Sequence, residues 1–277
     1  MQEISNIKNL KMDWNLSFAG ENFLGNFVPA FSANNIFFAD ATVQIKSINP
    51  SKGKINWEQK INPLSSGIAS GFGILVVADI DGNVISLNQT DGSILWSTNV
   101  KGEVLAPTAI STKLVIVKTG SGELLALDRD NGSIIWSYRS KLPSLTIRGS
   151  SSPVIEDDKI YVSFDNGRLG AFQIDTGFLI WDGAISYVEG TSELDNMIDA
   201  DAAPVLEGGL LFIANYQGQI AAFDPAQRRI VWADKASSFY SPIISKGVLA
   251  ILESNSTFKT YSIKTFKNSS NCVNAMP

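Results

Sequence analysis

One short phrase recurs along the chain, and every copy ends in tryptophan. Five copies read INPSKGKINW, LNQTDGSILW, LDRDNGSIIW, FQIDTGFLIW and FDPAQRRIVW, and one more tryptophan lies in MDWNLSF. Runs of β-branched and apolar residues are separated by Gly, Asn and Asp, as in strands joined by tight turns. A repeat of about 40 residues with this patterning is typical of a β-propeller, in which each repeat forms one four-stranded antiparallel sheet, or blade. The sequence therefore predicts an all-β propeller.

The third repeat gives the strands of one predicted blade. APTAI (106–110) is the expected inner strand, followed by KLVIVKT (113–119), ELLALD (123–128) and SIIWSYR (133–139). The second of these is almost entirely apolar, as expected for a sheet that is covered on both faces. No segment of the chain has a convincing helical period over ten residues, so the pattern favours strands throughout.

The tryptophans are expected to be structural, because a large ring at a fixed point in each outer strand fills the gap between neighbouring blades. These residues are Trp14, Trp57, Trp96, Trp136, Trp181 and Trp232. A glycine lies four residues before four of them and is expected in the hairpin turn, whereas Arg228 takes that place in the fifth phrase and predicts a different turn. Trp14 belongs to an orphan outer strand, which is a candidate to complete the terminal blade.

The repeats also predict the domain organisation. Five complete repeats and a partial sixth, GVLAILESNSTFKTYSIKT, provide about six blades. We expect a single propeller domain over residues 12–265, an N-terminal tail over 1–11 and a C-terminal tail over 266–277. The pattern is compatible with a closed ring and with an open one.

Composition excludes several classes of function. The chain has 277 residues, a net charge of −5, no histidine and a single cysteine, Cys272. The acidic balance argues against nucleic-acid binding, and the missing histidine removes the usual general base and the commonest zinc ligand. No apolar run is long enough to span a membrane. The first residues lack the apolar region of a secretory signal, so we expect a cytosolic protein or a chain that begins after, or without, its export segment.

Two long connections interrupt the regular repeats. LPSLTIRGSS (142–151) and SYVEGTSELDNMIDADAAP (186–204) each join consecutive predicted blades. In antiparallel blades, such connections leave on the same face as the turn between the second and third strands. We therefore expect the two segments to be neighbours on one face, where loops on a rigid scaffold commonly form binding surfaces.

The side chains in these segments permit two interpretations. In the first, Leu145, Ile147 and Arg148 face a partner protein together with Asp199 and Asp201, since apolar anchors beside an arginine are typical of protein contacts. Alternatively, the two apolar residues pack in the core as part of an inner strand, and the arginine pairs with the acids to hold the loops. The pattern alone favours neither.

A metal site is a further candidate in the second segment. Glu193 and Asp195 join the two aspartates in an acidic cluster that would attract Ca²⁺, a cation that prefers oxygen ligands. The ligand order of an EF-hand loop is missing, and acidic loops are usually solvated. We therefore expect no bound metal and no hydrolase that works through two carboxylates.

The tryptophan phrases resemble the repeat of quinoprotein-like propellers, which include pyrroloquinoline-quinone dehydrogenases and proteins that bind no quinone. The two long connections indicate which family among these propellers the chain resembles. PSLTIRG (143–149), GTSELDNMIDADAAPV (190–205) and the earlier GENFLGNFVPAFSANNIFFAD (20–40) are similar to segments of the outer-membrane assembly factor BamB family. The resemblance covers residues 12–265.

This resemblance implies a non-enzymatic scaffold of the β-barrel assembly machinery, the BAM complex, on the periplasmic side of the outer membrane. The two segments would dock onto the periplasmic POTRA region of BamA, with the family's docking positions falling on Leu145, Ile147, Arg148, Asp199 and Asp201. The resemblance also implies that nascent outer-membrane proteins are assisted, by strands that add to exposed sheet edges. It implies no cofactor.

The chain departs from the family in three ways. The family forms an eight-bladed ring, whereas this chain has material for about six blades and ends in FKNSSNCVNAMP, which is no seventh repeat. The family is also anchored through an acylated cysteine that precedes the propeller, whereas Cys272 lies near the opposite end. We therefore expect a truncated or divergent chain, with ring closure and membrane anchoring in question.

Two other functions remain open. A quinone-dependent dehydrogenase needs a metal-bound quinone, a catalytic carboxylate and commonly an adjacent cysteine pair, and a chain with one cysteine and no histidine is poorly equipped for it. A generic propeller interaction module with another partner also fits the pattern.

Overall fold

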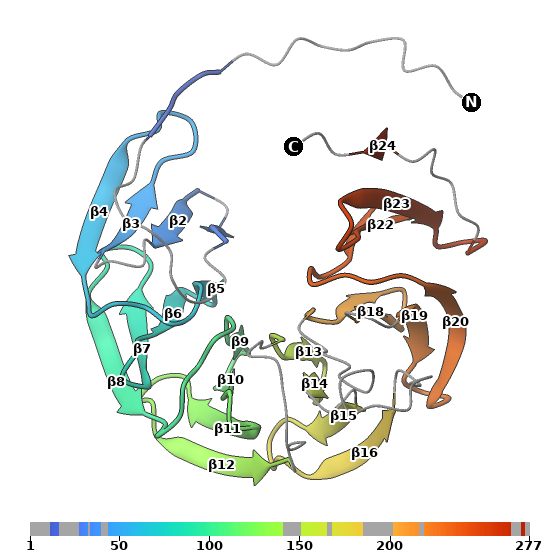
Figure 1. Ribbon diagram of the computed structural model, residues 1–277. Coiled ribbons are helices and arrows are strands. Elements are labelled where there is room, and N and C mark those ends of the chain that lie inside the picture. Colours follow the sequence, from blue (N-terminus) through green and yellow to red (C-terminus); the bar gives the residue numbers. More distant parts are fainter. Residues whose placement is uncertain are drawn as a thin grey trace.

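The computed structural model describes residues 12–16, 28–32, 34–39, 44–140, 151–164, 168–184, 202–215, 219–266 and 273–274. Within these residues the chain forms six antiparallel sheets of four strands each and no helix. Figure 1 shows the sheets arranged around an arc, with the first strands β5, β9 and β13 toward the centre and the fourth strands β4, β8, β12, β16 and β20 on the outer rim. The predicted all-β propeller with six four-stranded blades is confirmed.

The strands follow chain order within every sheet. The first sheet has β1 (Ala30–Phe31), β2 (Ile36–Ala39), β3 (Gln44–Ile48) and β4 (Ile55–Lys60). The second has β5 (Ala69–Gly71), β6 (Ile74–Ala78), β7 (Asn83–Asn88) and β8 (Ile94–Asn99). The third has β9 (Ala109–Ile110), β10 (Leu114–Lys118), β11 (Glu123–Asp128) and β12 (Ile134–Arg139). The fourth has β13 (Val154–Glu156), β14 (Lys159–Phe164), β15 (Arg168–Gln173) and β16 (Leu179–Ala184). The fifth has β17 (Val205–Glu207), β18 (Leu210–Ala214), β19 (Gln219–Asp224) and β20 (Arg229–Lys235). The sixth has β21 (Ile243–Ser245), β22 (Val248–Leu252), β23 (Thr257–Ser262) and β24 (Val273–Asn274).

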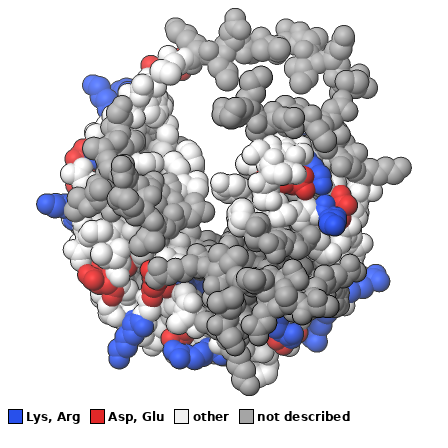
Figure 2. Space-filling view, in the orientation of Figure 1, with Lys and Arg blue, Asp and Glu red and all other residues white. Residues whose placement is uncertain are grey.

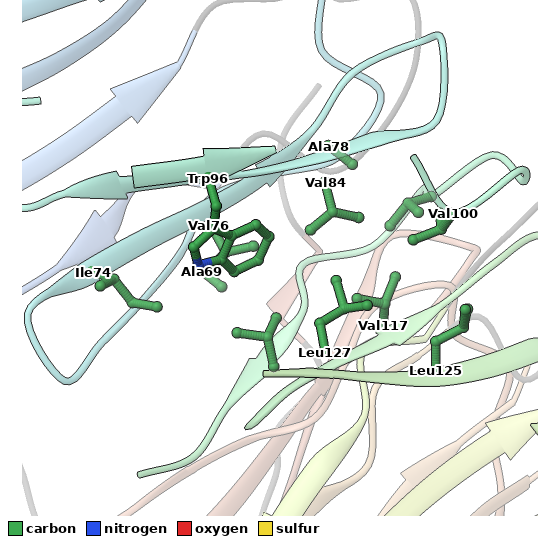
Figure 3. Packing of buried hydrophobic residues seen from close by; sticks show 12 residues of the cluster. Ala69, Ile74, Val76, Ala78, Val84, Trp96, Val100, Val117, Leu125 and Leu127 are labelled. Atoms are coloured by element: carbon green, nitrogen blue, oxygen red, sulfur yellow. The ribbon is translucent and has the colours of Figure 1, made fainter. Parts of the chain in front are cut away.

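Neighbouring sheets pack face to face through apolar side chains that alternate along their strands. Between the second and third sheets, Val76 and Val84 lie in one buried cluster with Val117 and Leu127 (Figure 3). Equivalent strands form the core between each later pair of sheets. Because β6 and β10 are buried on both faces, their near-continuous apolar sequences are explained.

Four of the recurring tryptophans dock onto the next sheet along the chain. Each ring covers the turn between the third and fourth strands of that sheet, and each indole N–H donates to a backbone carbonyl in the turn. The pairs are Trp14 with Pro50 O (2.8 Å), Trp57 with Gln89 O (3.0 Å), Trp96 with Arg129 O (2.7 Å) and Trp136 with Ile174 O (2.8 Å). Three of these contacts tie the first three blades to their successors at the outer rim, and the contact of Trp14 ties the segment 12–16 to the first blade.

The glycine four residues before the tryptophan makes this docking possible. Gly177 has φ of 67°, in the left-handed region, and a Cβ there would lie 2.5 Å from Cε3 of Trp136. Only glycine combines that backbone with so close a ring. The corresponding pairs are Trp14 over Gly53, Trp57 over Gly92 and Trp96 over Gly132.

The other two tryptophans pack on aromatic rings of the following blade. Trp181 lies 5.1 Å from the ring of Phe223, measured between centroids. Trp232 makes an edge contact with Tyr261 at 5.0 Å and stacks on Phe266 at 5.3 Å. The docking of an outer-strand tryptophan on the next blade is therefore kept where the turn glycine is lost.

Arg228 corrects one sequence-based expectation. It occupies the glycine position of the fifth repeat and was expected to change the turn, yet its φ of 54° lies in the same left-handed region as the glycines. The backbone of this exposed arginine is strained, because the left-handed region is unfavourable for a residue with a Cβ. The fifth repeat therefore changes the side chain at this position and keeps the class of backbone conformation.

Replacing Arg228 with glycine is expected to raise the free energy of unfolding by about 1 kcal/mol, because glycine adopts this φ without the steric penalty of a Cβ. Chemical denaturation of the two proteins measures the difference. The matched control is Arg229→Gly, in β20, where glycine should lower stability instead. Equal effects of the two changes would contradict the argument.

The last sheet differs from the others. Its fourth strand is the short β24, in which Asn274 pairs with Thr257 and Val273 with Phe258. The orphan strand of Trp14 was a candidate for this place, but residues 12–16 form no strand. Part of the predicted tail 266–277 also joins the sheet, through β24 and the stacked ring of Phe266.

The arc has an uncovered end. Figure 1 shows the first and sixth sheets apart. In the other sheets, one face packs against the next sheet along the chain. On the sixth sheet the same face carries Ile243, Val248 and Phe258, which are 67%, 42% and 41% exposed. The opposite face is buried, and burial raises the pKa of Tyr261, whose hydroxyl stays protonated and donates to Oδ2 of Asp234 at 2.9 Å.

Candidate partner-binding face

Two of the five connections between consecutive sheets are longer than the others. Residues 140–153 join β12 to β13, and residues 185–204 join β16 to β17. The remaining connections are the shorter segments 61–68, 100–108 and 236–242. The strand bounds therefore place the two predicted excursions between the third and fourth and the fourth and fifth blades.

Backbone hydrogen bonds place these connections on one face of the propeller. The amide of Ser140, the first residue after β12, donates to Gly122 O at 2.9 Å, in the turn between β10 and β11. In the second sheet, the amide of Val100 donates in the same way to Gly82 O at 2.9 Å. Because β12 and β16 run in the same sense in neighbouring antiparallel sheets, both long connections begin on the face that carries these turns.

The residues predicted to bind a partner lie outside the described residues. This holds for the docking positions and for the two other acids of the predicted cluster, namely Leu145, Ile147, Arg148, Glu193, Asp195, Asp199 and Asp201. Their proximity to one another stays a prediction. What the structure describes is the framework from which the two segments leave and to which they return.

The start of the first connection is fixed by an aromatic cluster between the third and fourth sheets. Tyr138, near the end of β12, makes an edge contact with Phe172 at 4.8 Å and a tilted contact with Phe164 at 6.4 Å. Phe164 and Phe172 meet edge to face at 6.1 Å. A Cβ at Gly170 would lie 2.8 Å from the Phe172 ring, so glycine is needed for this packing. Aromatic pairs of this kind hold their strands firmly.

The ends of the second connection are held by polar contacts. Before it, Arg168 of β15 forms an ion pair with Asp182 of β16, with Nε 2.7 Å from Oδ2. Both side chains are more than 40% exposed, so this pair orients the strand and contributes little stability. After it, Ala202 is buried, and the amide of Ala203 donates to Oγ of Ser241 at 2.9 Å, which ties the segment to the connection that leads into the sixth blade.

The charges of the described residues are mixed. Figure 2 shows lysines and arginines next to aspartates and glutamates around the rim, with neither sign gathered into one large patch in that view. Within the described residues no group of three His, Cys, Asp or Glu side chains is placed to hold a metal ion. The same part of the chain contains no helix with the length and apolar character of a membrane span.

These features define a class of protein: a propeller whose four-stranded blades dock through outer-strand tryptophans and which carries two long connections on one face. The chain belongs to the family of the outer membrane protein assembly factor BamB, whose family model matches residues 25–268.

Individual relatives agree with this assignment. The chain is 32% identical over 245 residues to the outer membrane protein assembly factor BamB of Escherichia coli strain K12, which covers 84% of the chain and 62% of that protein. It is 30% identical over 239 residues to the factor of the same name in Yersinia pestis, covering 82% of the chain and 61% of the relative. The chain thus spans about three fifths of the length of these curated relatives.

Solved structures share the fold. The crystal structure of BamB from Moraxella catarrhalis matches with a TM-score of 0.80 at 24% identity, covering 87% of this chain and 73% of that one. A europium-containing methanol dehydrogenase matches with a TM-score of 0.64 at 14% identity, covering 88% and 68%. At these identities the likenesses establish the propeller and carry no statement about activity.

Proposed function

We propose that this chain acts as a non-enzymatic scaffold of the β-barrel assembly machinery and docks onto the periplasmic POTRA region of BamA. The observation that carries the proposal is where the two resembling segments fall in the fold. The two segments that resemble the family's docking segments fall in the two longest connections between the described sheets, on neighbouring blades and on one face. Membership of the BamB family supplies the partner.

The chemistry of the two segments suits a protein contact. Leu145 and Ile147 would enter the partner as apolar anchors, and Arg148 would add the bidentate hydrogen bonds that make arginine common at such sites. Asp199 and Asp201 would offer carboxylates to basic groups of the partner. Isoleucine replaces the second leucine of the family's motif, and this change keeps apolar bulk, so the contact is retained.

The scaffold role also uses the described framework. One propeller domain over residues 12–265, flanked by segments 1–11 and 266–277, would hold the docking face rigid on the periplasmic side of the outer membrane. The outer strands β8 and β12 carry exposed apolar pairs, Ile94 with Leu95 and Ile134 with Ile135. Nascent outer-membrane proteins would add their strands to such edges.

Binding to the isolated POTRA region of BamA tests the proposal directly. We expect purified chain to bind it saturably in isothermal titration, and to recover BamA in a pull-down from envelope extract. Wild-type chain that is folded, as judged by a cooperative unfolding transition, but gives no heat of binding and recovers no BamA would refute the proposed function.

The same protein preparation separates the scaffold from a quinone-dependent dehydrogenase. Purified chain mixed with Ca²⁺ and pyrroloquinoline quinone should leave the absorbance spectrum of the free quinone unchanged. A saturable spectral change would favour the dehydrogenase class. The scaffold proposal rests on family membership and on the single cysteine and missing histidine of the sequence.

A further inference from the structure

A lysine is buried in the core beside Ser151, near the end of the first long connection. Lys118, the last residue of β10, is 2% exposed and is the one cation among the buried side chains of the described residues. The other five sheets have Ala39, Ala78, Ser163, Ala214 and Leu252 at the corresponding position of their second strand, opposite the second residue of the third strand. Propeller packing therefore does not require a lysine here, and an ammonium group in the core is costly unless it is well coordinated.

The surroundings of Lys118 include an aromatic ring and a hydroxyl. Its Nζ lies 5.9 Å from the centroid of the Phe164 ring, within the range of a cation–π interaction. The same atom donates to Oγ of Ser151 at 3.5 Å. That hydroxyl is itself buried and donates to Ser163 O at 2.9 Å, so the ammonium group is linked to the backbone of β14.

These contacts bring both ends of the connection 140–153 to one place. Ser151 is the last residue of the predicted segment 142–151 and the first described residue after Ser140, and the lysine holds its side chain. Tyr138, two residues before the connection begins, packs on Phe164, the ring that faces the ammonium group. Lys118 thus lies where the segment leaves β12 and where it returns toward β13.

We infer that Lys118 is a positioning residue for the docking face: its ammonium group, held between the Phe164 ring and the Ser151 hydroxyl, fixes the return point of the segment that carries Leu145, Ile147 and Arg148. The expected effect of Lys118 on BamA binding rests on the proposed function. The positioning itself is a property of this chain alone.

Lys118→Met tests the inference, because methionine keeps the length and apolar stem but removes the charge and the donors. We expect the backbone amides of Ser151 and Ser152 to exchange about tenfold faster with deuterium, and affinity for the POTRA region to fall about tenfold, as for a residue that acts through its neighbours. The free energy of unfolding should stay equal or rise, since an apolar side chain of similar size commonly replaces a buried ion without loss. The control is Lys113→Met, an exposed lysine just before β10, which should change none of the three.

Ser151→Ala is the second variant, which leaves the lysine in place and removes the hydroxyl that it contacts. It should accelerate exchange at Ser152 and lower affinity in the same direction. Unchanged exchange in both variants, or affinity that falls only in proportion to lost stability, overturns the inference. If wild-type chain fails to bind the POTRA region, the proposed function fails, and the exchange rates alone still decide whether Lys118 positions the segment.

Discussion

Replacing Trp136 with alanine is expected to lower the free energy of unfolding by about 3–5 kcal/mol, the range for removing a large packed aromatic side chain. The ring covers Gly177 of the next blade, and its indole N–H donates to Ile174 O at 2.8 Å. Alanine would leave a cavity between the third and fourth blades and would leave that carbonyl without its donor. Chemical denaturation of both proteins measures the loss.

Ile135→Ala is the matched control for this change. Ile135 directly precedes Trp136 on the same strand, yet it is 51% exposed and faces solvent at the rim. Its truncation should change stability by less than about 0.5 kcal/mol, as for ordinary surface sites. Similar losses for the two variants would show that the outer strand as a whole, and not the docked ring, carries the stability. Folded Trp136→Ala should still bind BamA, since the ring packs on the turn between β15 and β16, at the end of the strands opposite to that from which the long connections leave.

The period of the tryptophans was sufficient to predict the fold. One tryptophan ring and one hairpin recur in each repeat because the blades pack against their successors in the same way. The strands expected for the third repeat at 113–119, 123–128 and 133–139 agree with β10, β11 and β12 to within a residue at each end. The inner strand is shorter than expected, because only Ala109 and Ile110 pair with β10.

What the pattern could not give is the partner of each repeated residue. The glycines were expected only to serve their own hairpins, whereas Gly177 also receives the ring of Trp136 from the preceding blade. That relation joins residues 41 positions apart and has no local signature. Arg228 is a second example. A residue with a Cβ disfavours a positive φ, yet the packing around this turn holds Arg228 in that conformation, and the local sequence did not predict it.

Lys118 was also missed, although a signal was present. It ends the otherwise apolar strand β10, at a position where the aligned repeats have small or apolar residues. In a single strand a lysine at the last position is expected to be exposed, because strand ends commonly reach solvent. Only the comparison of all six second strands marks it as an exception, and only the packing shows that it is buried and contacts Ser151.

Reversing charge on the two docking segments is expected to lower affinity for the POTRA region of BamA by at least about 100-fold, since breaking an interfacial charge pair costs several kcal/mol. The variants are Arg148→Glu, and Asp199→Arg combined with Asp201→Arg. Unfolding midpoints should match the wild type, because the buried clusters of the described sheets are formed without these residues. Isothermal titration gives the affinities, and wild-type affinity in both variants would remove these residues from the interface.

The control reverses charge on the opposite face of the same blade. Asp158, in the turn between β13 and β14, forms an exposed ion pair at 2.9 Å with Lys159, the first residue of β14, at the other end of the strands from the long connections. Lys159→Glu changes the net charge by as much as Arg148→Glu does, and Asp158→Arg reverses an acid as in the second segment; each should leave affinity unchanged. A comparable loss there would mean that binding follows net surface charge and not a defined docking face.

Combining all three docking substitutions decides between the two interpretations that the sequence left open. If Arg148 pairs with Asp199 and Asp201 only to hold the segments together, the triple variant merely exchanges the signs of the pair, which restores the attraction and much of the binding. If the arginine and the acids each face groups of the partner, the triple variant presents the wrong charge at every position and binds no better than the variants with one segment changed. The proposed docking role requires the second outcome, and recovery of affinity in the triple variant would assign these residues to the internal support of the face.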